Sequence, residues 1–230
     1  MNMTRDGTVT EVVVGPEQLA GFLGMPEGGD PIGLVIFAHG SGSGRLSPRN
    51  QHVAAGLRQA GMATLLLDLL TPDEEQDRAN VFDIQLLAQR LLSATRWARG
   101  QSRLARLPIG YFGASTGAGA ALVAAAEASS EVSAVVSRGG RPDLAGEALE
   151  RVRAPTLLIV GGDDTGVIEL NQQALERLPG AKSLIIVPGA THLFEEPGTL
   201  NVVESLAREW FLDVLPAPHA AIGGAGGTGG

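Results

Sequence analysis

Short apolar runs alternate along this chain with longer segments in which apolar residues recur at helical spacing. The clearest run is residues 33–38, Gly-Leu-Val-Ile-Phe-Ala, which has no polar interruption. Runs of this length and composition are typical of strands that are covered on both faces, as in parallel sheets. We expect strands over residues 9–14, 19–23, 33–38, 63–67, 109–112, 134–137, 156–160 and 184–187.

Helical spacing fills most of the intervals between these runs. We expect helices over residues 48–60, 81–99, 116–128, 167–178 and 199–215. The alternation of strand and helix from residue 33 onward predicts an α/β fold, with a doubly wound, mostly parallel sheet and helices on both of its faces. Right-handed crossovers place the carboxyl ends of the parallel strands at one edge, where such sheets bind their ligands.

The composition indicates one folded unit followed by a flexible tail. Of the 230 residues, 44% are apolar and 18% are charged, which suits a chain that buries a substantial core. Residues 216–230 are rich in glycine, proline and alanine and cannot bury a face. We therefore predict an α/β domain over residues 1–215 and a flexible glycine-rich tail over residues 216–230.

Charge and cysteine content exclude several classes of function. The net charge of −8, with no basic run, argues against binding to nucleic-acid backbones. The absence of cysteine excludes disulfides, thiol catalysis and thiolate metal sites. Neither an apolar leader nor a run long enough to cross a membrane occurs in the sequence, so we expect a soluble cytoplasmic protein without nucleic-acid or membrane partners.

The most informative motif is residues 113–117, Gly-Ala-Ser-Thr-Gly, with an apolar run before it and a small-residue helical run after it. In this setting G-x-S-x-G is typical of a nucleophile elbow, a sharp strand-to-helix turn that holds a strained serine at its tip. The N-terminus of the following helix favours negative charge that develops beside the serine. We therefore identify Ser115 as the candidate nucleophile; the alternative is a glycine-rich turn with no catalytic role.

Polar residues also follow the strands over 156–160 and 184–187, so a serine, an acid and a histidine follow three different strands in that order. This chain order is the one expected of α/β-hydrolases. A serine hydroxyl is a weak nucleophile near neutral pH, so a histidine must take its proton. A carboxylate then fixes the imidazole tautomer and stabilises the imidazolium.

His192 is the candidate base, because the other three histidines suit other roles. His219 lies in the tail, and His52 falls within the helix over residues 48–60, where a solvated or capping side chain is expected. His39 stands at a strand end before glycines, where an imidazole more often braces a loop.

Two adjacent aspartates compete for the role of the acid. Either Asp163 or Asp164 can face the histidine, while the other faces solvent or caps the helix that begins near Val167. Asp143 is a weaker candidate, because its position after Pro142 is typical of a helix N-terminus.

An acyl-transfer site also needs two N–H donors that are aimed at the developing oxyanion. One is expected from Thr116, the residue after the nucleophile, and the other from Ser41 in the His-Gly loop after the strand over residues 33–38.

The glycines do not match nucleotide-binding motifs. A phosphate loop needs lysine after its last glycine, and Gly44 is followed by Arg45. A dinucleotide fingerprint meets Arg45 or Leu122 where it needs a small residue. No histidine and carboxylate set has metal-ligand spacing, so we expect neither a cofactor nor a metal.

With these residues in place, the chain resembles the α/β-hydrolase superfamily and, more narrowly, the dienelactone-hydrolase-like serine hydrolases. The resemblance covers residues 33–215 and rests on four blocks, at 37–43, 113–117, 157–164 and 189–194. It implies that the acid is the third residue after Gly161, which is Asp164. Dienelactone hydrolases proper use a cysteine nucleophile, whereas this chain has Ser115, so the resemblance favours a carboxylesterase.

The sequence therefore predicts a serine carboxylesterase that cleaves small neutral esters through an acyl-enzyme intermediate on Ser115. A thioesterase, amidase or lactone hydrolase with the same three residues is the first alternative. A catalytically silent binding module with this fold is the second. The segment over residues 138–153 is too short for a separate cap domain, so we expect loops 69–80 and 138–143 to cover the pocket.

Overall fold

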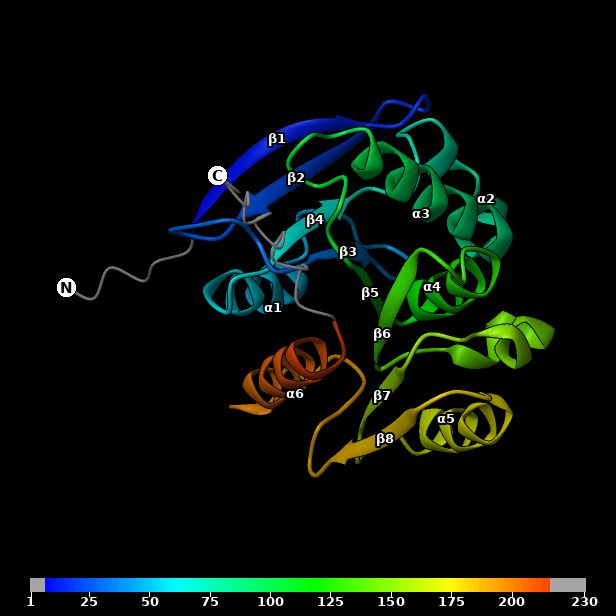
Figure 1. Ribbon diagram of the computed structural model, residues 1–230. Helices are drawn as coiled ribbons and strands as arrows, with labels where there is room; N and C mark the ends of the chain where they lie inside the picture. The colour runs from blue at the N-terminus through cyan, green and yellow to red at the C-terminus, as the bar shows by residue number, and fades with distance from the viewer. Residues whose placement is uncertain (1–6, 216–230) are drawn as a thin grey trace, which may run out of the picture.

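The computed structural model describes residues 7–215, which form an eight-stranded open sheet flanked by helices (Figure 1). The strand order is β1-β2-β4-β3-β5-β6-β7-β8; the first two strands run antiparallel to their neighbours, and the pairs from β4 to β8 are parallel. The strands are β1 (Thr8–Val14), β2 (Leu19–Met25), β3 (Leu34–Ala38), β4 (Ala63–Leu67), β5 (Ile109–Ala114), β6 (Val132–Arg138), β7 (Thr156–Gly161) and β8 (Lys182–Val187).

Helices cover both faces of the sheet, as the pattern predicts (Figure 1). The α-helices are α1 (Pro48–Gln59), α2 (Arg78–Phe82), α3 (Ile84–Arg99), α4 (Thr116–Glu127), α5 (Thr165–Arg177) and α6 (Thr199–Val214). Two 3₁₀ segments, η1 (Glu74–Gln76) and η2 (Pro142–Arg151), lie between them. Helices α1 and α6 pack on one face, and α3, α4 and α5 pack on the other.

Each face of the sheet has its own apolar core, because successive strand residues point to opposite sides. In β3, Ile36 packs in the core under α3 and α4, whereas Phe37 packs in the core under α1 and α6. Both side chains are almost fully buried. This double coverage accounts for the continuous apolar run that predicts the strand.

The predicted strands are confirmed, with ends that differ by a few residues, but the helix predicted over residues 81–99 is wrong at its start. The chain forms α2 and α3 there, and they meet at Asp83. The Asp83 carboxylate accepts the Leu86 N–H at 3.0 Å and caps α3, while Asp77 caps α2. Apolar periodicity continues across such a break, because a capping side chain changes the backbone direction without changing the spacing of apolar residues.

The segments over residues 69–80 and 138–143, which the sequence predicts as loops, contain helical turns. The first holds η1, where Glu74 pairs with Arg90 on α3 and accepts the Thr71 N–H at 2.9 Å. The second leads into η2, which begins at Pro142 and so bears out the helix N-terminus expected at Asp143. The predicted tail over residues 216–230 lies outside the described residues.

The sheet order brings distant parts of the chain to one edge. Strands β3, β5, β6, β7 and β8 are neighbours and parallel, so the segments after their carboxyl ends lie side by side. The four strand ends singled out in the sequence, those of β3, β5, β7 and β8, therefore meet there together with that of β6.

Candidate active site

Ser115 stands at a strained turn between β5 and α4. Its backbone has φ 51° and ψ −124°, in the left-handed half of conformational space that non-glycine residues rarely adopt. Two glycines leave room for this turn. A Cβ at Gly113 would lie 2.5 Å from the Cα of Ala118, and one at Gly117 would lie 2.3 Å from the carbonyl oxygen of Ala38. The motif thus forms a strand-to-helix elbow that holds the hydroxyl at the sheet edge, with strain of about 1–3 kcal/mol.

His192 connects Ser115 to a carboxylate. Its Nδ1 lies 2.6 Å from Asp164 Oδ2, and its Nε2 lies 3.3 Å from Ser115 Oγ. The histidine side chain is 37% exposed and the aspartate side chain 17%. With the Nδ1 proton donated to the carboxylate, Nε2 is left as an acceptor for the serine hydroxyl. This geometry can pass a proton from the hydroxyl to the imidazole while the carboxylate remains ionised.

The two competing aspartates point in different directions. Asp164 reaches His192, whereas the Asp163 side chain is exposed and only its backbone is engaged, through an N–H donated to Ala190 at 3.0 Å. Asp164 is also the residue before α5, but its side chain does not cap that helix. The structure therefore brings together Ser115, His192 and Asp164.

The other described histidines lie apart from this set. His52 is exposed on α1. His39 is 9% exposed, accepts the Leu69 N–H at its Nε2 (3.0 Å) and donates from Nδ1 to the Gly40 carbonyl (2.9 Å). Burial lowers the pKa of His39, because it disfavours the charged imidazolium, although Asp68 and Glu75 oppose that shift. Its two backbone partners make it a brace for the loop that carries Ser41.

That loop lies directly against the elbow. A Cβ at Gly40 would lie 2.9 Å from the Ser115 Cβ, so only glycine fits there. The next residue, Ser41, donates its N–H to the Thr116 Oγ1 at 3.0 Å. The two residues expected to supply oxyanion donors are therefore in contact, and the Thr116 hydroxyl occupies the Ser41 N–H, a contact that the sequence does not reveal.

A cleft of about 550 Å³ extends from Ser41 along the loop to Arg49. Asp68 and Glu75 also line this cleft. Arg45 forms an ion pair with Asp68, and its backbone N–H donates to the same carboxylate at 2.7 Å. The cleft is thus polar, and it begins at the loop that lies against the elbow.

Sequence reasoning missed one charged residue at this edge, Arg138. It ends β6, a strand that is otherwise apolar or small, and it is buried. Its carbonyl accepts the Ser115 N–H at 3.3 Å, which places it one strand from the elbow. An arginine at the carboxyl end of an apolar strand is the sequence signal that could have identified Arg138.

Within residues 7–215, no group of three or more histidine, aspartate or glutamate side chains is arranged to hold a metal ion. No helix in that same range is both long and apolar enough to cross a membrane.

The chain matches no protein-family model, but proteins of known structure resemble it. The crystal structure of a dienelactone hydrolase from Anabaena variabilis is 57% identical, with a TM-score of 0.85; the match covers 91% of this chain and 98% of that one. Est1E from Butyrivibrio proteoclasticus is 17% identical, with a TM-score of 0.75, over 89% of this chain and 98% of that one. The lidless serine hydrolase XC6422 from Xanthomonas campestris is 20% identical, with a TM-score of 0.74, over 91% and 96%. The last two share the fold.

Curated relatives in Mycobacterium tuberculosis are longer. Two proteins, each named a phosphoribosyl transferase, are 63% identical to this chain over 208 residues. The match covers 90% of this chain and 46% of each relative. The chain therefore spans about half the length of the curated relatives it matches.

Proposed function

The chain belongs to the dienelactone hydrolase family and is a hydrolase by that membership, and we propose that it is a serine carboxylesterase that cleaves small esters through an acyl-enzyme intermediate on Ser115. The observation that carries the proposal is the continuous hydrogen-bonded connection from Ser115 through His192 to Asp164. Nucleophile, base and orienting acid within hydrogen-bond reach are the arrangement that acyl transfer to serine requires.

In the proposed reaction, Ser115 Oγ attacks the ester carbonyl carbon while its proton moves to His192 Nε2. The carbonyl oxygen becomes an oxyanion, and the Thr116 N–H stabilises it at the N-terminus of α4. The Ser41 N–H donates to the Thr116 hydroxyl in the structure and joins the oxyanion only by leaving that hydroxyl. The imidazolium then gives its proton to the leaving alcohol oxygen, and the acyl group remains on Oγ. A water then attacks the acyl carbon while its proton moves to the same Nε2. The bond between the acyl carbon and Ser115 Oγ breaks, the imidazolium returns its proton to Oγ, and the acid is released.

A fluorophosphonate probe tests the serine assignment, because it reacts covalently with an activated serine hydroxyl. We expect the wild-type protein to be labelled on Ser115 and to hydrolyse short-chain nitrophenyl esters. Ser115→Ala should abolish labelling and lower turnover at least about 10³-fold, while the melting temperature stays the same or rises. Retention of more than about a tenth of wild-type turnover would rule out the assignment.

The same three residues can serve thioester, amide or lactone hydrolysis. These reactions differ in the leaving group, and the Ser115–His192–Asp164 arrangement is common to all of them. A substrate panel that matches the acyl group across ester, thioester, amide and lactone tests the ester assignment through the ratio of kcat/KM values. A higher kcat/KM for any other class would replace it.

The mycobacterial relatives are named for phosphoribosyl transfer, and we propose that this activity resides in the half of those proteins that the chain does not span. The Ser115–His192–Asp164 arrangement supports this division, because it provides a nucleophile and base for acyl groups. Assays of this chain for both activities should detect ester hydrolysis and no phosphoribosyl transfer.

A further inference from the structure

Arg138 is a buried positive charge without a carboxylate partner. Its side chain is 6% exposed, and no ion pair joins it to an acidic group in the described part of the chain. Its one hydrogen bond in that part is to Asn50 Oδ1 at 3.5 Å, the limit of the interaction, and its Nε has no partner. Burial, with a smaller contribution from Arg49, lowers the pKa of Arg138 to about 10, so it remains charged at neutral pH.

Such a group is unusual, because a buried charge is normally paired as well as hydrogen-bonded. A water molecule could satisfy the Nε–H but could not compensate the charge. Among residues 7–215 the guanidinium makes no well-formed bond that connects secondary-structure elements, since its bond to Asn50 is at the limit of the interaction. The arrangement therefore favours a negatively charged ligand group.

A second guanidinium lies close to the first. Arg49 directly precedes Asn50, the hydrogen-bond partner of Arg138, on α1, and after burial its charge is the second cause that lowers the pKa of Arg138. The Arg49 side chain is 32% exposed, pairs with the exposed Glu195 at 3.3 Å, and also has an unpartnered buried Nε. The first turn of α1 thus carries Arg49, contacts Arg138 through Asn50 and contains no acidic residue. All of these features favour an anion.

Both arginines come from segments that adjoin the candidate active site. Arg49 lines the cleft that begins at Ser41, and Asn50, the partner of Arg138, is the next residue on α1. The Arg138 carbonyl accepts the Ser115 N–H, so the backbone of Arg138 lies directly against the elbow. An anion held by these side chains would therefore lie between segments that also position Ser41 and Ser115.

We propose that Arg138 and Arg49 form a binding site for a phosphate-class oxyanion. A tetrahedral phosphate has enough acceptor oxygens for two guanidinium groups, and guanidinium matches its geometry with paired N–H donors. The phosphate comes from one of two sources, the free ion or a phosphate group on the substrate. The binding site is independent of the proposed function, whereas the second source depends on it.

Thermal unfolding with inorganic phosphate tests the site directly. In a buffer without other oxyanions, phosphate at about ten times its dissociation constant should raise the melting temperature by about 3–6 °C. Sodium chloride at equal ionic strength should not. An equal rise with chloride would show that the effect is charge screening and would overturn the proposal.

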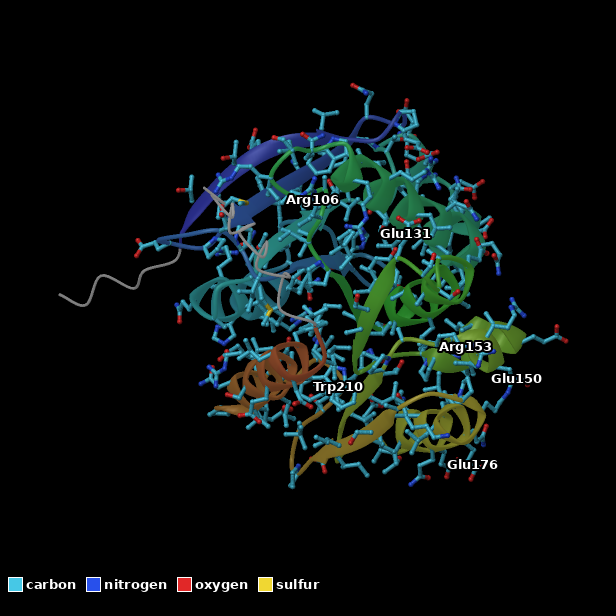
Figure 2. The ribbon with its side chains drawn as sticks, in the orientation of Figure 1. Arg106, Glu131, Glu150, Arg153, Glu176 and Trp210 are labelled. Atoms are coloured by element: carbon cyan, nitrogen blue, oxygen red, sulfur yellow. The ribbon has the colours of Figure 1, made fainter. Side chains whose placement is uncertain are left out.

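Two variants test whether the phosphate-induced rise in melting temperature depends on the two arginines. Arg138→Met removes a buried unpaired charge at similar volume, so without phosphate it should melt at or above the wild-type temperature and should lose the response to phosphate. Arg49→Gln, at a half-exposed position, should fold normally and respond less than the wild type. The matched control is Arg177→Gln, because Arg177 pairs with Glu150 at 2.9 Å, and Glu150 lies at the outer rim of the molecule (Figure 2), so this variant should keep the full response.

Loss of stability in Arg138→Met together with a retained phosphate response would assign Arg138 a structural role and overturn the proposal. If Arg138→Met fails to fold, the Arg49→Gln response decides, because an undiminished rise in melting temperature overturns the site.

A kinetic experiment then separates the two sources of the phosphate, the free ion and the substrate. Competitive inhibition of ester turnover by inorganic phosphate, weakened in Arg49→Gln, assigns the phosphate to the substrate, whereas stabilisation without inhibition assigns the site to the free ion. Failure of the proposed function would abolish ester turnover and leave the phosphate-induced rise unchanged.

Discussion

Two histidines, His39 and His192, follow strands whose carboxyl ends lie at the same edge of the sheet, but their surroundings differ. His39, after β3, is 9% exposed and has backbone partners for both ring nitrogens, at 3.0 and 2.9 Å. His192, after β8, has a 37% exposed side chain, with a carboxylate on one nitrogen and a serine hydroxyl on the other.

The difference shows how surroundings decide what an imidazole can do. The Leu69 N–H occupies the only acceptor nitrogen of His39, and burial lowers its pKa, so the ring is held neutral with no hydroxyl to accept from. At His192, the Asp164 carboxylate can compensate the imidazolium, and Nε2 faces Ser115. We therefore expect His192 to move a proton and His39 to hold a loop.

Removal of the His192 imidazole should have the largest effect. His192→Ala deletes the proposed base, and turnover should fall at least about 10³-fold. Stability should change little, because the side chain is more than one-third exposed. Steady-state kinetics and a thermal melt on the same preparation measure both quantities. Substantial turnover in this variant would remove the functional distinction between the two histidines.

Replacement of Asp164 or Asp163 with asparagine tests whether the Asp164 carboxylate is what distinguishes His192 from His39. Asp164→Asn keeps the volume but can hold the wrong tautomer and cannot compensate the imidazolium, so kcat should fall by about 10²- to 10⁴-fold. Asp163→Asn is the matched control, because Asp163 is adjacent and exposed, and it should remain close to wild type. Both should be compared at saturating ester. A reversed order would move the acid to Asp163.

His39→Ala should show the opposite phenotype to His192→Ala. It leaves a cavity and an unsatisfied Leu69 N–H, so the protein should lose about 2–4 kcal/mol of unfolding free energy in urea. Below its melting temperature, the variant should retain more turnover than His192→Ala, because the Ser115–His192–Asp164 arrangement is intact. Unchanged stability would show that the ring does not brace the loop.

The smallest expected effect is a pH dependence of stability. The pKa of His39 in the folded protein lies below its ordinary value of 6.5, so the unfolded chain takes up this proton first as the pH falls. The contribution of His39 to stability is therefore complete above about pH 6.5 and is lost below it, towards the folded-state pKa. Urea unfolding at several pH values should show a loss below pH 6.5 that is weaker in His39→Gln. An identical slope in that variant would assign the loss to other groups.

Most of the fold and much of the candidate site could be predicted from local patterns. The apolar run at residues 33–38 identifies a strand covered on both faces, and the glycines around Ser115 identify the elbow. The brace role expected for His39 agrees with its two backbone partners. Such features are local, because each depends on a few neighbouring residues and their spacing.

Contacts between distant segments were not predictable in the same way. The residues alone left Asp163 and Asp164 open, because adjacent side chains differ only in direction, and family resemblance was needed to choose. The bond from Ser41 to Thr116 joins residues 75 positions apart and also escaped the pattern. The division of the 81–99 helix at Asp83 is local, but apolar spacing does not show which polar side chain caps a helix. Each depends on one side chain meeting a particular backbone or side-chain atom.

By itself, the sequence determined the alternation of strands and helices, the elbow at Ser115 and the order in which serine, aspartate and histidine follow their strands. Only the tertiary structure decided which of these groups meet. The parallel order β3-β5-β6-β7-β8 gathers strand ends that are far apart in the chain, so that His192 lies 77 positions from Ser115 in sequence and 3.3 Å from it in space. The same packing buried Arg138 against Asn50 on α1, because burial and pairing depend on what the other elements place around a residue, which local spacing does not encode.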